Sequence, residues 1–186
     1  MILALCESHM IIPIGTKQFE IDDEDYDKIR LYPWTIGHNG YVEYKYDDNG
    51  TTVVVRLHRL LMGAEFSGDE VDHKDRNKLN YRKNNLRPCT KQQNSFNKPK
   101  QSGFTSPYKG VYWGKHISEW IANINFNYKT IYLISSPNIL RCAYAYNIAA
   151  TFLIKEFAYL NPIEYNDDKL KTFIENKLQR YVNNKR

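Results

Sequence analysis

A polar stretch within residues 71–94 constrains the fold of this chain more than any other part of it. An apolar strand residue leads directly into Asp72 and His73, a basic loop follows, and a second short segment returns through Asn85. Thr90–Asn94 then has the pattern of a helix start, because a threonine followed three residues later by a glutamine can form a reciprocal capping box. The stretch therefore predicts the order strand, loop, strand and helix.

The polar side chains of this stretch can carry phosphodiester hydrolysis with one hard metal ion. The carboxylate of Asp72 and the amide oxygen of Asn94 are ligands that Mg²⁺ accepts, and Mg²⁺ keeps positions open for water and substrate phosphate. A neutral imidazole such as that of His73 can take a proton from water near pH 7. Neighbouring strand residues point to opposite faces, so Asp72 and His73 share a site only at a strand end or bulge. Spacing alone leaves this convergence open.

The run Asp72-His73, followed by Asn85 and Asn94, resembles the HNH, or ββα-metal, nuclease motif, especially that of the phage homing endonucleases. The upstream segment 57–63, LHRLLMG, is similar to the segment that precedes the motif in those enzymes. The resemblance implies that Asp72 and Asn94 bind Mg²⁺ or Mn²⁺. It also implies that the catalytic residues are His73, as general base, and Asn85, which would hold the His73 ring in position. The alternative is a polar hairpin loop with His73 merely at the surface.

Charge is distributed unevenly along the 186 residues, whose formal net charge is +5. The first fifty residues hold ten acidic and four basic side chains, so the rest of the chain is strongly basic. A basic body favours a polyanionic partner, and we expect double-stranded DNA. Phosphate contacts provide affinity without sequence information. The basic residues of the motif that we expect to make them are Lys74, Arg76, Arg87 and Lys91.

Cysteine usage and hydropathy exclude several classes of protein. The three cysteines are far apart and form no CxxC pair, so no zinc ribbon, disulfide framework or bound zinc is expected. No stretch approaches the roughly 18 uninterrupted apolar residues of a membrane helix, so no membrane partner is expected. A reducing, intracellular setting is predicted, and the resemblance implies the cytoplasm of a phage-infected host cell. Whether residues 1–9 are native stays open, since Met10 is an alternative start.

The first 56 residues are predicted to form short strands and turns. Asn49-Gly50 is a strong hairpin turn signal between two β-forming runs. The acidic run 22–27 is typical of a helix N-terminus, where carboxylates suit the helix dipole. Helix capping and solvation explain these acids better than a metal site does. We interpret His58 as a packed structural residue rather than a ligand.

The second half of the chain predicts a three-stranded sheet followed by a helix. Residues 99–107 have the proline, glycine and serine content of a linker. Three β-forming segments follow within residues 108–134, separated by turns. Ser136-Pro137 then offers an N-cap with proline at the first helical position, and the helix should run to about Phe157. Small residues would let this helix lie close against the sheet: Ala143, Ala145, Ala149 and Ala150.

This half resembles an AP2/ERF-type DNA-binding domain. The matching residues are Tyr108-Lys109-Gly110-Val111, Trp120 with Ala122, Ala145-Tyr146-Asn147, Ala149-Ala150 and Phe157-Ala158-Tyr159-Leu160-Asn161. In that family the exposed face of the sheet enters the major groove. The residues that would face DNA, carried over by position, are Lys109, Tyr112, Asn123, Asn125, Thr130 and Tyr132. Asparagine can pair with adenine, although plain solvent-facing strand positions explain these asparagines equally well.

Together these features predict an α+β protein. A small β-rich region leads into the ββα-metal unit, an antiparallel three-stranded sheet with a helix follows, and an amphipathic C-terminal helix docks on its own protein. The predicted parts are an HNH nuclease domain at 1–98 with its motif at 57–98, a linker at 99–107, an AP2/ERF-like domain at 108–162 and the C-terminal helix at 163–186. A monomer or a weak dimer is expected.

The function predicted from these parts is that of a metal-dependent DNA endonuclease of the HNH homing type, whose AP2-like domain selects the site. The main alternative is a DNA-binding regulator whose HNH unit has lost catalysis. The intact motif disfavours it, because binding alone does not require these four polar residues. A third possibility, an interaction module without nucleic acid, is disfavoured by the basic run 74–100. The target sequence, and whether one strand or both are cut, stay open.

Overall fold

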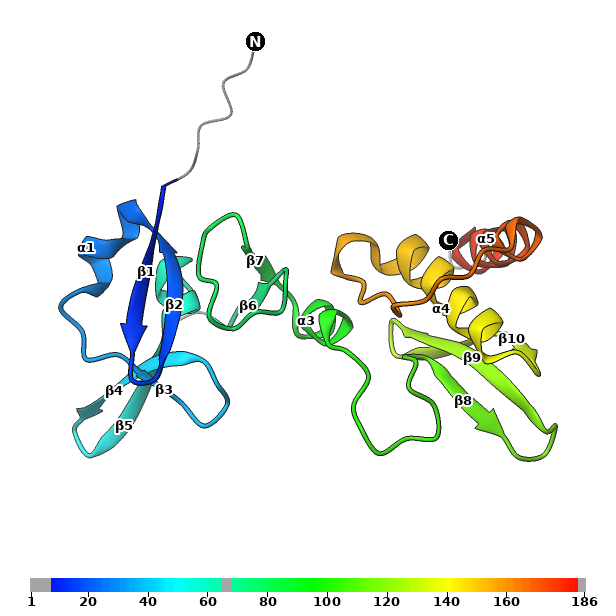
Figure 1. Cartoon of the computed structure of the whole chain (residues 1–186), viewed down its shortest axis with the longest axis horizontal. Coiled ribbons are helices and arrows are strands. Elements are labelled where there is room, and N and C mark those ends of the chain that lie inside the picture. Colours follow the sequence, from blue (N-terminus) through cyan, green and yellow to red (C-terminus); the bar gives the residue numbers. More distant parts are fainter. Residues whose placement is uncertain (1–7, 65–67, 184–186) are drawn as a thin grey trace, which may run out of the picture. The chain divides into compact units, whose positions relative to one another are not determined.

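The computed structural model describes residues 8–64 and 68–183 of the chain. They belong to two compact units, Met1–Ser95 and Phe96–Arg186, which are described one after the other (Figure 1). The division between the units falls shortly before the predicted linker. The assignment of functional domains to these parts of the chain stays a prediction.

The first unit begins with two small antiparallel sheets. The hairpin of β1 (His9–Ile14) and β2 (Lys17–Asp22) is followed by the short helices η1 (Asp23–Asp25) and α1 (Tyr26–Ile29). The second sheet has the order β3-β4-β5, formed by β3 (Thr35–Ile36), β4 (Val42–Asp48) and β5 (Thr51–Arg56), and α2 (Leu57–Leu61) follows directly. The predicted turn at Asn49-Gly50 is confirmed, since its two residues have φ values of 53° and 82° and join β4 to β5.

The motif at the end of the first unit folds as β6 (Glu70–His73), β7 (Leu86–Cys89) and α3 (Lys91–Asn97), with β6 antiparallel to β7. The predicted order of strand, loop, strand and helix is confirmed. The predicted capping box is confirmed as well: Gln93 N donates to Thr90 Oγ1 at 3.1 Å, and Thr90 N donates to Gln93 Oε1 at 2.8 Å. These two bonds define the start of α3 and so determine where Asn94 lies.

One apolar core joins the sheets of the first unit to the loop of the motif. Tyr81, between β6 and β7, is fully buried, and its ring meets Phe19 edge to face at 5.8 Å. Its hydroxyl oxygen accepts a hydrogen bond of 2.7 Å from Val42 N. Glu20 on β2 donates through its backbone to Leu79 and accepts from Tyr81, each at 2.8 Å. The loop is therefore anchored to β2 and β4.

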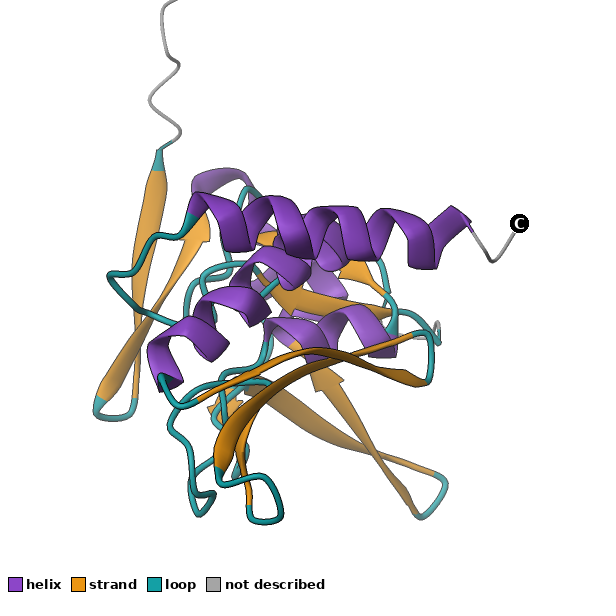
Figure 2. Cartoon of the chain, turned by 90° about the vertical axis from the view of Figure 1, so that its right-hand side faces the viewer, coloured by secondary structure: helices purple, strands orange, loops and turns teal. Residues whose placement is uncertain are grey.

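The second unit is a sheet covered by two helices. Strands β8 (Val111–Gly114), β9 (Glu119–Phe126) and β10 (Lys129–Ser136) are antiparallel in the order β10-β9-β8. Figure 2 shows α4 (Ile139–Ile154) against one face of this sheet and α5 (Asp168–Asn183) packed on α4, with η2 (Lys155–Phe157) following α4. The four alanines expected to allow close packing are all fully buried: Ala143, Ala145, Ala149 and Ala150.

The predicted start of α4 at Ser136-Pro137 is wrong by two residues. Asn138 is the N-cap, because its Oδ1 accepts hydrogen bonds from Leu140 N at 2.9 Å and Arg141 N at 3.4 Å. Ser136 instead ends β10, and its Oγ accepts a hydrogen bond from Asn138 N. Asparagine caps helices as well as serine does, and because Ser136 is still part of β10, the helix begins after Asn138.

Candidate active site

The β6–β7 hairpin carries a set of charged and polar side chains on one of its faces. Asp72 pairs across the hairpin with Arg87, and Glu70 pairs with Cys89, so these four residues lie on the same side. The Arg87 guanidinium donates to Asp72 Oδ2 through Nε at 3.0 Å and Nη2 at 2.7 Å. The side chains of Arg87 and Asp72 are only 11% and 7% exposed. The site therefore contains a buried, hydrogen-bonded ion pair.

The first turn of α3 brings Asn94 to this same face. Its Nδ2 donates to Glu70 Oε2 at 3.1 Å. The neighbouring Cys89 thiol is affected by the same residues. Burial first, and then the carboxylates of Asp72 and Glu70, raise its pKa to about 11. A hydrogen bond with the Asn94 backbone lowers this pKa and so opposes the shift. The structure thus gathers the two predicted metal ligands, Asp72 and Asn94, with Glu70, which sequence reasoning missed, and with Arg87, which was expected to contact phosphate.

His73, the last residue of β6, is buried among aromatic rings. The ring centroids of Tyr81, His58 and Tyr41 lie 5.2, 5.3 and 5.7 Å from that of His73. Burial first, and then the charge of Asp72, raise the pKa of the Tyr41 hydroxyl. The alternative of a surface histidine is therefore excluded. His73 is the last residue of β6 and still pairs with Leu86 across the hairpin, so its sharing of a site with Asp72 stays a prediction.

Burial keeps the two histidines of this cluster neutral at pH 7. Burial lowers the pKa of His73 to about 4, with the carboxylates of Asp75 and Asp72 opposing the shift and Lys78 adding to it. The pKa of His58 falls to about 3, first because of burial and then because of His73 and nearby arginines. A neutral imidazole has a nitrogen lone pair that can accept a proton, which is the state a general base requires.

Asn85 was expected to hold the His73 ring in position, but its side-chain hydrogen bonds go to the loop that follows His73. Its Nδ2 donates to Asp75 Oδ1 at 2.9 Å and to Asn80 O at 2.8 Å, and its Oδ1 accepts from Asp75 N at 3.0 Å. Its backbone carbonyl also accepts from Lys74 N at 2.9 Å. Asn85 therefore holds the loop that follows His73, and it acts on the histidine only through the backbone.

The donor atoms fit a hard divalent cation. Asp72 offers carboxylate oxygen, and the nitrogen of the Asn94 amide is bonded to Glu70, so the amide oxygen is the atom left for a ligand role. Two oxygen donors suit an ion that completes its shell with water and substrate phosphate. Within the residues that the structure describes, no group of three or more His, Cys, Asp or Glu side chains forms a closed metal cage.

The basic residues expected to bind DNA fall into two groups. Lys74, Arg76 and Lys91 are exposed around the motif, as a phosphate contact requires. Arg87 differs, because it is buried and paired with Asp72. Its predicted phosphate contact does not fit this arrangement, since moving it to DNA would leave a buried carboxylate without its charge partner. Apart from the place of Arg87 on β7, no local pattern indicates that it faces an acid across the hairpin.

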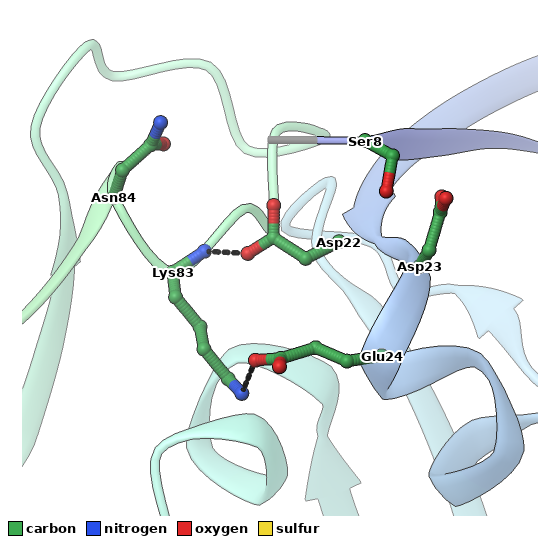
Figure 3. Close-up of a pocket in the computed structure, with 6 residues that line it drawn as sticks. All are labelled: Ser8, Asp22, Asp23, Glu24, Lys83 and Asn84. Atoms are coloured by element: carbon green, nitrogen blue, oxygen red, sulfur yellow. Dashed lines mark hydrogen bonds and ion pairs between the residues drawn. The ribbon is translucent and has the colours of Figure 1, made fainter. Parts of the chain in front are cut away.

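The acidic segment 22–27 lies at a helix N-terminus, as predicted, since Asp23, Glu24 and Asp25 form the first turn of η1, but it also makes contacts that the sequence did not indicate. With Ser8, Lys83 and Asn84 it lines a hollow of about 320 Å³ (Figure 3). Asp22 accepts hydrogen bonds from Arg82 Nε at 3.3 Å and Lys83 N at 2.7 Å, and the Lys83 ammonium pairs with Glu24. Neither short helix has a side-chain cap. These acids therefore hold the residues that immediately precede Asn85.

In the second unit, five of the six residues expected to face DNA share one face of the sheet. They lie opposite the face that α4 covers, since Ala122, Ile124 and Ile131 between them are buried. The five residues are Tyr112, Asn123, Asn125, Thr130 and Tyr132, with Thr130 Oγ1 donating to Asn125 Oδ1 at 2.7 Å. The outward alternation of the strands accounts for this arrangement.

Lys109 is the exception. Its Nζ donates to the carbonyls of Phe96 at 2.7 Å and Lys98 at 2.6 Å, and its backbone N donates to Asn161 Oδ1 at 2.7 Å. Burial, with a smaller effect of Lys98, lowers the pKa of Lys109 to about 8. Its ammonium caps backbone carbonyls of its own unit, so its expected contact with DNA does not fit the structure.

Sequence reasoning missed Glu70, Tyr41 and His58 as neighbours of the site. Glu70 could have been found, because it lies two residues before Asp72 and must share its face if the strand is regular. Tyr41, which immediately precedes β4, and His58 on α2 reach His73 from other parts of the unit, and only tertiary packing brings them together. No local pattern marks them.

Comparisons with known proteins agree with this geometry. The profile of the HNH endonuclease family matches residues 56–96, which include the whole hairpin and most of α3. An uncharacterised HNH endonuclease of Acanthamoeba polyphaga mimivirus is 36% identical over 140 residues, 74% of this chain and 71% of that protein. The H-N-H endonuclease F-TflII of Escherichia phage T5 is 38% identical over 82 residues, 41% of this chain and 42% of that protein. No solved structure matches the chain.

A strand–loop–strand–helix unit with an acid, a histidine and two asparagines at these places defines an HNH nuclease domain. The chain belongs to the HNH endonuclease family and is an endonuclease. Endonucleases of this family use a divalent metal ion. Among the described helices, none is long and apolar enough to cross a bilayer.

The buried histidines should make the stability of the protein depend on pH. Their pKa is lower in the folded chain than the ordinary value of 6.5, so the unfolded chain binds more protons below that pH. The stabilisation is present at pH 7 and is lost as the pH falls through 6.5 towards 4. We expect the free energy of unfolding to fall by roughly 1–2 kcal/mol per histidine between pH 7 and pH 5, measured by urea denaturation.

The matched comparison is His58→Gln against His38→Gln, because His38 is exposed. The difference in stability between pH 7 and pH 5 should shrink in His58→Gln and stay at the wild-type value in His38→Gln. An unchanged difference in both variants would contradict the neutral, buried state of His58.

Proposed function

We propose that this endonuclease is a homing-type enzyme that hydrolyses phosphodiester bonds of double-stranded DNA with one divalent metal ion. The observation that carries the proposal is the set on the β6–β7 hairpin: the Asp72 carboxylate and the Asn94 amide over one face, beside a histidine that burial keeps neutral. DNA binding without hydrolysis does not require this combination of a carboxylate, an amide and a neutral histidine.

Asp72 and Asn94 are the residues that would hold the ion, Mg²⁺ or Mn²⁺, through one oxygen each. When bound, the ion stabilises the negative charge that develops on the scissile phosphate and on the leaving oxygen. The buried Arg87 supplies a fixed positive charge next to Asp72. This charge partly cancels the negative charge that Asp72 presents to the metal ion. The substrate phosphate would therefore supply a large part of the negative charge around the ion.

His73 takes the proton of the attacking water on a ring nitrogen. The rings of Tyr41, His58 and Tyr81 restrict its rotation, and Asn85 fixes the loop behind it. The position of the base is therefore set by packing on one side and by a hydrogen-bonded loop on the other. Products with 5′-phosphate and 3′-hydroxyl ends follow from the resemblance to the phage homing enzymes.

DNA affinity and site selection are assigned to different surfaces. Lys74, Arg76 and Lys91 contact phosphates close to the site, which gives affinity without sequence information. The outer face of β8-β9-β10 is proposed to read bases in the major groove, as in an AP2/ERF-like domain. Support comes from the sheet-and-helix arrangement and from the outward Asn123 and Asn125. Asparagine can pair with adenine through two hydrogen bonds.

The proposed division of labour follows the parts predicted from the sequence. Residues 1–98 cut, 99–107 link, 108–162 select the site and 163–186 form the supporting helix. We propose that the chain acts as a monomer or weak dimer in the cytoplasm of a phage-infected host cell. One active site per monomer nicks one strand, so a double-strand break requires a dimer or two successive events.

The His73→Ala variant tests the catalytic assignment. Supercoiled plasmid carrying phage DNA should be nicked by the wild type with Mg²⁺ or Mn²⁺ and not with EDTA. His73→Ala should reduce the nicking rate by at least about 100-fold, because general base catalysis contributes that much, and should bind DNA as tightly as the wild type.

The exposed His38 again provides the control, and His38→Ala should cut normally. Near-normal cutting by His73→Ala would contradict the assignment of His73 as the general base. DNA binding without cutting by the wild type under either metal would favour the alternative of a regulator that has lost catalysis.

The double substitution Asn123→Ala with Asn125→Ala tests the sheet as the base-reading surface. Each lost base contact weakens discrimination by about 1–3 kcal/mol, so preference for the target over other sites should fall by about tenfold or more. The maximal rate of hydrolysis should not change. Cleavage of a mixed pool of DNA fragments, sequenced at the ends, measures the preference, with Asn166→Ala as an exposed control outside the sheet. Unchanged site preference would count against the sheet as reader.

A further inference from the structure

We propose that Glu70 is a positioning residue of the endonuclease, which orients the side-chain amide of Asn94 so that its oxygen and not its nitrogen is presented to the metal ion. The inference rests on the proposed function, since it requires Asn94 to be a metal ligand. It concerns a residue outside the four that define the motif.

The hairpin brings Glu70 to the correct face. Glu70 and Asp72 are two residues apart on β6, so their side chains leave the strand in the same direction. Glu70 Oε2 accepts the hydrogen bond from Asn94 Nδ2 at 3.1 Å, and this bond joins β6 to the first turn of α3. The capping box holds that turn at its start, so the backbone of Asn94 is fixed independently of Glu70. What Glu70 adds is the orientation of the amide.

The orientation matters because the two ends of an amide have opposite polarity. The oxygen of Asn94 accepts hydrogen bonds and coordinates cations, whereas its nitrogen carries two hydrogens that repel a cation. A half-turn of the amide exchanges them. An ionised carboxylate can only accept, so Glu70 selects the orientation in which Nδ2 faces it and Oδ1 faces away. Partners of this kind commonly change metal affinity by about 10–100-fold.

The two proposed ligands are held by supporting residues of opposite charge. Asp72, an anion, is held by the cationic Arg87, and Asn94, which presents a donor group, is held by the anionic Glu70. Each supporting residue lies on the same face as the ligand that it holds. The face therefore consists of two ligands and two supporting residues of opposite charge.

Mn²⁺ titration of the full chain by calorimetry tests the inference without measuring activity. Glu70→Ala should weaken Mn²⁺ binding by about tenfold, because the amide becomes free to rotate. Glu70→Gln should lose less affinity than Glu70→Ala, because the glutamine Oε1 can still accept from Asn94 Nδ2, although its amide nitrogen can also donate to Asn94 Oδ1 in the opposite orientation. Glu164→Ala, which removes an exposed carboxylate of the second unit, should bind as the wild type does.

Two results would overturn the role of Glu70. Equal losses in Glu70→Gln and Glu70→Ala would mean that its charge is what matters, as for a direct ligand. No loss in Glu70→Ala would mean that the hydrogen bond does not control the amide. Asn94→Ala distinguishes these failures from failure of the proposed function: wild-type affinity in Asn94→Ala would overturn both proposals, whereas a loss there without one in Glu70→Ala overturns only the positioning role.

The substitution Asn94→Asp provides a double-mutant test that a general loss of structure does not mimic. Both oxygens of an aspartate coordinate cations, so no orientation has to be selected. In the Asn94→Asp background, Glu70→Ala should therefore leave Mn²⁺ affinity unchanged or raise it, since a repulsive carboxylate is removed. The same tenfold loss in both backgrounds would contradict the inference. Unfolding curves of the metal-free variants show whether each one is folded.

Discussion

The buried ion pair between Asp72 and Arg87 is the interaction on which the candidate active site depends. A buried carboxylate is tolerated only when it is paired and hydrogen-bonded, and removing one partner of such a pair costs about 3–5 kcal/mol. The two residues are direct neighbours across the β6–β7 hairpin. A shift of the register by one residue would turn one of them to the opposite face, so the ion pair favours a single register. That register also sets Glu70 opposite Cys89 and brings both beneath Asn94.

The hairpin thereby separates two kinds of chemistry. One face has oxygen donors and charges, and the end of the strand has an imidazole surrounded by Tyr41, His58 and Tyr81. Tyr41 contacts the His73 ring, and the charge of Asp72 helps to raise the pKa of its hydroxyl. The charged face and the buried imidazole are neighbours along β6, which ends at His73. The anchoring of the following loop by Asn85 keeps the strand end in place.

The parts that could be predicted from the sequence are those set by local chemistry. The capping box at Thr90 and the Asn49-Gly50 turn each depend on a few neighbouring residues, and both are confirmed. The contacts of Arg87, Asn85 and Lys109 could not be predicted from neighbouring residues, because each depends on a partner that only the fold brings near. The contacts of Asp22 and Glu24 could not be predicted for the same reason, since their partners Arg82 and Lys83 lie some sixty residues away. Basic character alone does not distinguish a phosphate contact from an internal ion pair.

The most direct test of the account is to locate a bound Mn²⁺ ion in the isotope-labelled protein by NMR, through the paramagnetic broadening that it causes. The signals of Asp72, Glu70 and Asn94 should broaden first, at Mn²⁺ concentrations that leave Asn123 and the acidic segment 22–25 unaffected. Asp72→Ala should abolish this selective broadening. Broadening that begins at the acidic hollow near Asp22, or that persists at β6 in Asp72→Ala, would contradict the claim that this hairpin holds the metal ion.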